Sequence, residues 1–286
     1  MYEGRWKTRE LAPLRARFAA PVWQGEEDIR DKRLLVYAEQ GHGDTLQFCR
    51  YLPRLLSQCA QLAVEVQPSL IALLKPAFPG VNFVAGGEPL PEHDRCCGLM
   101  SLPLVFGTRL ETIPAVVPVH APGDGVNEWS WILGEPRVPR VGLAWRGSPR
   151  HTQDARRSLA FTELIGLLDM PLEFHCLHVE PMPPESDGTS IRWWGNQLRS
   201  FSDTAGLIHH MDLVISVDTA VAHVAASMGK PTWIILSSLP DFRWLLERED
   251  SPWYPSVRLF RQDSEGQWRG VVERLRHETI RHFSLK

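Results

Sequence analysis

Several features that would place this chain in a special class are missing from its 286 residues. It has five cysteines, an odd number without a CxxC pair, so neither a disulfide framework nor a redox motif is expected. Cys96 and Cys97 are adjacent and are interpreted as packing residues. Basic and acidic residues number 31 and 34, and this balance argues against a nucleic-acid-binding surface. No apolar run approaches the ~20 residues that span a bilayer.

Targeting and catalytic signatures are missing as well. The N-terminal sequence MYEGRWKTRELAPLR has no apolar core after its charges, so no signal peptide is predicted and a cytoplasmic location is expected. No Asp-x-Asp pair occurs, which argues against a metal-bridged sugar-nucleotide site. HExxH, GxSxG and GxxxxGK[ST] are also absent, and neither a metal nor a cofactor is expected. His175, Cys176 and His178 share a predicted strand and are interpreted as packing residues.

What the chain does contain is an alternation of strand and helix patterns. In the first half, strands are predicted at 34–40, 62–67 and 81–85, with helical patterns after the first two. In the second half, strands are predicted at 141–145, 172–179, 212–217 and 232–236, and helices at 161–168, 204–210 and 219–228. Ser202 or Asp203 is the expected N-cap of the helix at 204–210. Such alternation is typical of parallel sheets with crossover helices.

A stretch rich in proline and glycine, 118–139, separates the two sets and is expected to be irregular. We therefore predict an α/β protein with two Rossmann-like lobes whose parallel sheets face a central cleft. The expected division is a helical linker at 1–30, an N-terminal lobe at 31–135, a C-terminal lobe at 136–265 and a C-terminal helix at 266–286.

The first candidate site is the turn after the first predicted strand, at the sheet edge where α/β proteins bind ligands. Its residues are Gln40, Gly41, His42, Gly43 and Asp44. The glycines allow close backbone approach, and the Asp44 carboxylate could accept a proton from a hydroxyl. The alternative is that Asp44 only caps the helix. The turn is not a GxGxxG, so a dinucleotide site is poorly supported.

The second candidate runs from the strand at 212–217 into the next helix and contains Ser216, Asp218, Thr219, Ala220 and His223. Thr219 and His223 are four residues apart and share a helix face. The amides of Thr219 and Ala220, at the positive end of the helix, suit a diphosphate. Asp218 would repel a diphosphate, so it is assigned to capping or to a sugar hydroxyl. A histidine buried in the core is the alternative for His223.

Two weaker candidates complete the set. The loop after the strand at 141–145 contains Arg146, His151, Arg156 and Arg157, and arginines there could neutralise phosphate oxygens; a solvated surface loop is the alternative. The segment with Asp241, Arg243 and Trp244, followed by EDSPWYP (249–255), combines aromatic and acidic side chains and is assigned to the acceptor side or the cleft. This combination suits a sugar or a nucleobase as well as it suits helix packing and a turn fixed by proline.

With these segments the sequence resembles glycosyltransferase family 9 and heptosyltransferase-like proteins, of the kind found C-terminal to tetratricopeptide repeats in bacteria. The segments that carry the resemblance are AEQGHGDTLQFCRYLP (38–53), GEPLPEHD (87–94), MSLPLVFGTRLETIPA (100–115), VGLAWRGSPRHTQDARRS (141–158), FSDTAGLIHHMDLVISVDTAVAHVAASMGKPTWIIL (201–236) and DFRWLLEREDSPWYPSVRLFRQ (241–262). It implies the two-lobed GT-B fold, with the acceptor on the N-terminal lobe and a nucleotide-diphosphate sugar on the C-terminal lobe.

The resemblance further implies inverting, metal-independent transfer to a hydroxyl of a protein or a surface glycan, with Asp44 at the position of the family's base. Asp218, Thr219 and His223 match the donor motif. Ala220 stands where heptosyltransferases carry glycine, and arginines stand where they carry lysine, which argues against an ADP-heptose donor. The alternatives are a GT-B-like domain that binds a nucleotide sugar or a partner without catalysis, and a nucleotide-sugar epimerase.

Overall fold

The computed structural model describes residues 2–148 and 154–285 and divides the chain into two compact units, one ending at Val119 and the other beginning at His120. Each unit has one sheet, and every strand pair within the two sheets is parallel. The predicted α/β class with two parallel sheets is therefore confirmed. Among the described residues, no helix combines the length and the apolar character needed to cross a membrane.

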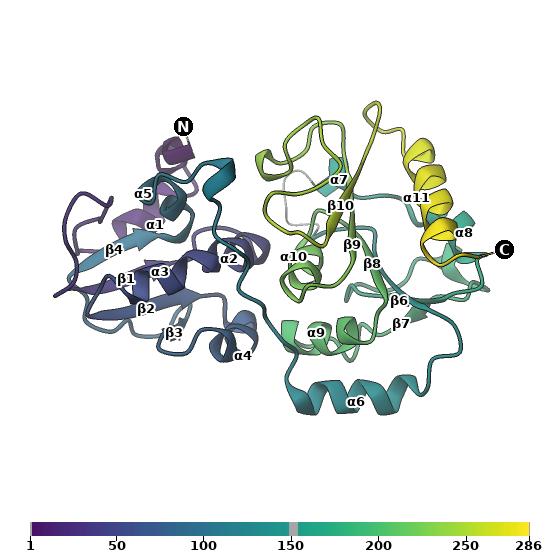
Figure 1. Ribbon diagram of the computed structural model, residues 1–286, viewed down its shortest axis with the longest axis horizontal. Coiled ribbons are helices and arrows are strands. Elements are labelled where there is room, and N and C mark those ends of the chain that lie inside the picture. Colours follow the sequence, from purple (N-terminus) through teal and green to yellow (C-terminus); the bar gives the residue numbers. More distant parts are fainter. Residues whose placement is uncertain (1, 149–153, 286) are drawn as a thin grey trace. The chain divides into compact units, whose positions relative to one another are not determined.

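The first unit has a four-stranded sheet in the order β3-β2-β1-β4. Its elements are η1 (Tyr2–Lys7), α1 (Ala12–Ala16), β1 (Arg33–Tyr37), α2 (His42–Phe48), η2 (Cys49–Tyr51), α3 (Leu52–Leu56), β2 (Gln61–Val66), η3 (Pro68–Leu70), α4 (Ile71–Leu74), η4 (Lys75–Ala77), β3 (Asn82–Ala85), β4 (Arg95–Gly98), η5 (Leu99–Ser101), α5 (Leu102–Val105) and η6 (Leu110–Thr112). Figure 1 shows β1 in the interior of this sheet, with α2 following its carboxyl end.

The N-terminal segment packs on this sheet. Trp6 belongs to the same buried cluster as Leu35 and Tyr37 of β1, and Phe18 stacks on the Tyr37 ring with centroids 4.2 Å apart. Further along, the Trp23 amide donates a hydrogen bond to the carbonyl of Cys96 in β4. Residues 2–23, expected as part of a linker, thus cover one face of the first sheet.

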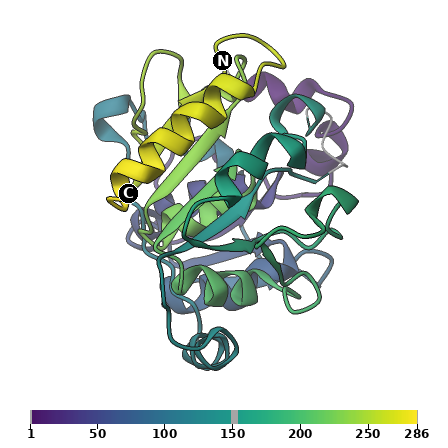
Figure 2. The same ribbon diagram turned by 90° about the vertical axis from the view of Figure 1, so that its right-hand side faces the viewer.

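The second unit has a six-stranded sheet in the order β10-β9-β8-β5-β6-β7. Its elements are α6 (Gly123–Leu133), β5 (Arg140–Ala144), α7 (Asp154–Arg157), α8 (Phe161–Leu168), β6 (Glu173–Cys176), η7 (Pro184–Ser186), β7 (Arg192–Trp193), α9 (Phe201–His209), β8 (Leu213–Val217), α10 (Ala220–Ser227), β9 (Thr232–Leu236), η8 (Phe242–Trp244), β10 (Val257–Arg261) and α11 (Arg269–His282). The apolar sides of α8 and α11 form one core with alternate residues of the strands, and Figure 2 shows α11 lying across the strands.

Some elements differ from the prediction. The stretch 118–139 contains the helix α6, because Trp129 is buried against α9 and its Nε1 donates to the carbonyl of Asp203 at 3.0 Å. Helix α9 begins after Ser200, whose side chain accepts from the Asp203 amide, so the expected N-cap at Ser202 or Asp203 is wrong. Asp203 instead completes a capping box at the third helical position. Near the C-terminal end, α11 runs from Arg269 to His282.

Candidate active site

The turn after β1 places Asp44 in the first turn of α2. The Asp44 carboxylate accepts a hydrogen bond from the Gly41 amide at 2.8 Å, which is the contact of a helix cap. A Cβ on Gly41 would lie 3.2 Å from the same carboxylate oxygen, so glycine permits this close approach. Asp44 itself is half-buried. Asp44 therefore caps α2. Its role as a base is a separate hypothesis.

Polar contacts also fix the neighbours of Asp44. His42 Nε2 lies 3.0 Å from Ser69 Oγ, and burial lowers the pKa of His42. Gln67 donates to the Gln40 carbonyl at 2.8 Å and accepts from Thr45 at the same distance. The turn is thus tied to the residues that follow β2. The structure brings together all five predicted residues of this turn, since they are consecutive and Gly43 lies inside α2.

In the second unit, β8 ends at Val217 and α10 begins at Ala220, with Thr219 as its N-cap residue. The Thr219 side chain makes no capping hydrogen bond; its hydroxyl lies 3.3 Å from Ser216 Oγ instead. The first amides of a helix have no acceptor within the helix. The side chain of Thr219 therefore does not bind the first amides of α10. A site for an anionic ligand requires that these amides are not bound in this way.

Asp218 directly precedes Thr219, the N-cap residue of α10, and its carboxylate faces His223. Its Oδ1 lies 3.7 Å from Nε2 of His223, and its side chain is mostly buried. Burial raises the pKa of Asp218, but the hydrogen bond with His223 and the charge of Arg243 outweigh it and bring the pKa to about 2. Asp218 is consequently a carboxylate at neutral pH, held in place by the histidine one turn into α10.

Aromatic side chains enclose His223. Its ring is 2% exposed, and its Nδ1 lies 3.0 Å from the hydroxyl of Tyr254, which is fully buried. The ring of Trp244 lies 5.5 Å from the imidazole. Because Asp218 faces Nε2 and Tyr254 faces Nδ1, the protein occupies both nitrogens of His223. Tyr254 belongs to the stretch 249–255 of the last candidate segment, but its contact with His223 could not be predicted from the sequence.

The segment at 241–244 joins this group. Asp241 is the N-cap of η8 and accepts from both the amide and Nε of Arg243, the latter at 2.7 Å. Arg243 and Trp244 are buried. The next residue, Leu245, has φ 57°, which is rare for a branched side chain. The structure therefore places Asp241, Arg243 and Trp244 in the second unit, which also contains the donor motif.

The three arginines after β5 have different partners. Arg157 donates to the main-chain carbonyl of Asp218 at 2.7 Å and to Asp154 at 3.1 Å, and it packs on Gly147, where a Cβ would overlap it. Arg146 instead donates to the Pro181 carbonyl at 2.8 Å. Arg156 is largely exposed and pairs with Glu265. Only Arg157 thus meets the second candidate site directly; His151 lies outside the described residues.

The three residues of β6 and its end that were interpreted as packing residues are buried. His175 Nδ1 accepts from Trp194 Nε1 at 3.1 Å, and burial lowers its pKa to about 4. His178 packs against Trp145, and burial lowers its pKa to about 3. In the described part of the chain, no three His, Cys, Asp or Glu residues are grouped so that they could hold a metal ion.

Comparison with known proteins adds to this geometry. Residues 199–238 match the model of glycosyltransferase family 9 (heptosyltransferase), and this stretch contains Asp218, Thr219 and His223. The solved glycosyltransferase of family 9 from Veillonella parvula superposes with a TM-score of 0.63 at 11% identity, over 91% of this chain and 99% of that one. The fold is GT-B. This chain is similar to family 9 over residues 199–238 and shares its fold with the Veillonella parvula protein.

Two further relatives extend the comparison. The heptosyltransferase TibC from enterotoxigenic E. coli, solved in complex with ADP-D-β-D-heptose, superposes with a TM-score of 0.58 at 16% identity, over 89% of this chain and 78% of TibC. Protein FlbA of Caulobacter vibrioides is 26% identical over 304 residues, which cover 96% of this chain and 50% of FlbA. The chain thus spans about half the length of this relative. Together, the family match and the fold support a glycosyltransferase.

Proposed function

We propose that the protein is an inverting, metal-independent glycosyltransferase that moves a sugar from a nucleotide-diphosphate donor to a hydroxyl of a protein or glycan acceptor. The observation that carries this proposal is the start of α10. There a helix end without a side-chain cap lies beside a carboxylate that His223 and Tyr254 hold in place. The match to family 9 covers the start of α10 together with Asp218 and His223.

The donor diphosphate is assigned to the first turn of α10. The helix dipole and the amides of Ala220 and Val221 favour an anion there, and the small side chain of Ala220 lets phosphate oxygens approach. Arg157, which contacts the carbonyl of Asp218, adds positive charge close to this turn. These groups would stabilise the charge that develops on the leaving diphosphate.

Asp218 is assigned to a hydroxyl of the donor sugar. Its low pKa makes it an acceptor-only group at neutral pH, and a carboxylate is a strong acceptor for a sugar O–H. The positive charge of Arg243, which lowers the pKa of Asp218, offsets the repulsion between Asp218 and the diphosphate. His223 would act through Asp218, because its buried ring meets protein groups at both nitrogens.

Asp44 is assigned as the base, on its place in the turn after β1 and on the family resemblance. The acceptor hydroxyl would lose its proton to Asp44 while its oxygen attacks the anomeric carbon, and the nucleotide diphosphate would leave with the bonding electrons. One displacement of this kind inverts the configuration. TibC was solved with an ADP-heptose. Because Ala220 stands where heptosyltransferases carry glycine, we assign the donor only to the class of nucleotide-diphosphate sugars.

The first test is a thermal-shift series with UDP-, GDP- and ADP-linked sugars and a CMP-linked sugar, which lacks the diphosphate. A bound ligand raises stability by RT ln(1 + [L]/Kd), so at 100 Kd the gain is about 2.7 kcal/mol. We expect a rise in Tm with at least one diphosphate donor and none with the CMP sugar. Asp218→Asn should abolish most of this rise, and Arg156→Ala, which removes a surface cation, should keep it. A rise that is equal in all three proteins would refute the donor site.

The second test concerns Asp44. A general base contributes about 10²–10⁴-fold to a rate. Asp44→Asn keeps an oxygen that can accept from the Gly41 amide, so the fold should be retained. We expect unchanged donor affinity and transfer reduced at least a hundredfold. Donor binding without turnover in the unmodified protein would favour the non-catalytic binding domain, and an altered donor sugar without transfer would identify an epimerase.

A further inference from the structure

The N-terminal 3-10 helix η1 is built into the end of the first sheet from which the candidate acceptor turn emerges. Its Trp6 is 8% exposed and its ring lies 5.9 Å from that of Tyr37 in β1. Gly98 at the end of β4 makes room for it, because a Cβ there would lie 2.6 Å from Trp6 Cζ2 and 3.0 Å from the Glu39 carboxylate. The shape of this contact therefore fits η1 against β1 and β4, and charged side chains add to it.

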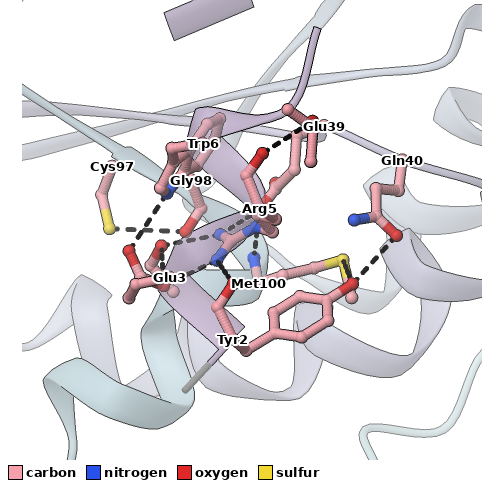
Figure 3. A network of polar contacts seen from close by, with 11 residues as sticks. Tyr2, Glu3, Arg5, Trp6, Glu39, Gln40, Cys97, Gly98 and Met100 are labelled. Carbon is pink, nitrogen blue, oxygen red and sulfur yellow. Dashed lines mark hydrogen bonds and ion pairs between the residues drawn. The ribbon is translucent and has the colours of Figure 1, made fainter. Parts of the chain in front are cut away.

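Arg5 is the centre of this contact (Figure 3). Its Nη2 donates to Glu39 Oε1 at 2.6 Å and to Ser101 Oγ at 2.8 Å, and its Nη1 donates to Glu3 at 2.6 Å. The guanidinium also lies over the rings of Tyr2 and Trp6, 4.9 and 4.4 Å from their centroids. Arg5 is 7% exposed, so its guanidinium is shielded from solvent. An ion pair in such surroundings holds a fixed geometry.

Glu39 connects this network to the candidate acceptor turn. Its Oε1 also accepts from the Met100 amide at 3.0 Å, so one carboxylate joins η1, the residues after β1 and the residues after β4. Gln40, the first residue of the turn that leads to Asp44, follows it directly. The position of η1 is thereby fixed relative to that turn.

Tyr2 is the aromatic residue of η1 that remains open to solvent. Its hydroxyl donates to Gln40 Oε1 at 3.0 Å and lies 3.9 Å from the Met100 sulfur, while the residue is 40% exposed. Figure 3 shows the Tyr2 ring between Arg5 and Gln40. An exposed aromatic ring thus stands beside the polar residues of the turn. Sites that bind small ligands combine an apolar ring with a few placed polar groups in this way.

We propose that Tyr2 determines acceptor specificity: its ring stacks on the C–H face of an acceptor sugar whose hydroxyl is presented to the turn at Gln40–Asp44. This rests on the proposed function in that the turn is taken as the acceptor site. The flat ring has an apolar face for sugar carbons and a polar edge that Gln40 holds in place. Arg5 and Glu39 act as positioning residues, since they orient Tyr2 without being exposed themselves.

The experiment uses saturation-transfer NMR with methyl glycosides as acceptor probes, namely the α and β methyl pyranosides of glucose, galactose, mannose and N-acetylglucosamine. We expect the unmodified protein to bind at least one of them, Tyr2→Ala to weaken this binding at least tenfold, and Tyr2→Phe, which keeps the ring, to weaken it less than threefold. Trp131→Ala is the matched control, because Trp131 is an aromatic residue of α6 with 86% exposure. It should leave binding unchanged.

Two results would overturn the inference: no glycoside binding by the unmodified protein, or equal binding by Tyr2→Ala. The thermal shift with nucleotide-diphosphate sugars, measured on the same variants, keeps the two proposals distinguishable. If a nucleotide-diphosphate sugar still raises Tm and glycoside binding does not depend on Tyr2, only the inference about Tyr2 fails. If glycoside binding depends on Tyr2 but no donor binds, the sugar site stands and the transferase proposal fails.

Discussion

Replacement of Arg5 by methionine gives a sharp test of the network that holds η1. Methionine keeps much of the apolar contact with Trp6 and Tyr2 but leaves the Glu39 carboxylate, whose side chain has no exposed surface, without its cation. Removing one partner of a buried ion pair costs about 3–5 kcal/mol, because the remaining charge is left without compensation. We expect a loss of this size in the free energy of unfolding at pH 8, measured by urea denaturation.

The same loss should shrink at low pH. Burial raises the pKa of Glu39 to about 7 even though Arg5 and the Met100 amide oppose this, whereas an unfolded glutamate has a pKa of about 4.3. A raised carboxyl pKa gives stability that is full below the unfolded value and is lost as pH rises towards the folded value. At pH 5.5 Glu39 is protonated in the folded protein, with or without Arg5. The cost of Arg5→Met should then fall to about 1–2 kcal/mol, the size of lost neutral hydrogen bonds.

Two further variants make this test specific. Adding Glu39→Gln to Arg5→Met removes the buried charge, so most of the loss at pH 8 should be recovered and the pH dependence should disappear. Arg30→Met removes an exposed ion pair with Asp28 and should change nothing measurable at either pH. If Arg5→Met costs the same at both pH values, η1 has simply detached and Glu39 has gained water, and the explanation by a buried charge is refuted.

Three other outcomes are expected. Donor binding in the thermal-shift assay should survive EDTA, since the sequence has no Asp-x-Asp pair; a loss that Mg²⁺ or Mn²⁺ restores would contradict this. Tyr254→Phe should weaken donor binding about twofold to tenfold, because the lost hydrogen bond to His223 loosens Asp218 by about 0.5–1.5 kcal/mol; unchanged calorimetric affinity in a folded variant would show that His223 only packs in the core. Gly98→Ala should cost about 1–3 kcal/mol of stability, because its Cβ would overlap Trp6; an unchanged Tm would show that η1 adapts freely.

Strands and helices with long uniform patterns could be predicted from the sequence. The strand at 232–236 and the helix at 161–168 are found at the predicted bounds, since one is a run of buried apolar residues and the other has apolar residues at helical spacing. β4 was missed because RCCG is short and includes arginine and glycine, and it becomes a strand by pairing with β1. α6 was missed because Gly123 and Gly125 favour a loop, and burial of Trp129 against α9 outweighs that local preference.

Some residues of the candidate site could likewise be predicted from the sequence, and others could not. Asp218 and His223 could be recognised together because they are close in sequence, on a strand end and the helix after it. Tyr254 lies 31 residues from His223, and Arg5 lies 34 residues from Glu39. Nothing in a single sequence specifies such long-range partners, because they depend on how the chain returns to the sheet edge. Asp218 was assigned either to capping or to a sugar hydroxyl, and the structure adds that its carboxylate faces the side chain of His223.

Glu39, which is buried, and Asp218, which is mostly buried, are two carboxylates at strand ends with different roles. Glu39 and Asp218 both lose water on folding, and for each this is the largest influence on the pKa. For Asp218, the hydrogen bond with His223 and the charge of Arg243 exceed the loss of water, so it stays ionised above a pH of about 2 and can accept a ligand hydroxyl throughout an assay. For Glu39 the loss of water prevails, so it titrates near neutral pH. A change in donor affinity between pH 6 and 8 therefore should not arise from Asp218, whereas a change in stability over that range would point to Glu39 and to the helix that it holds.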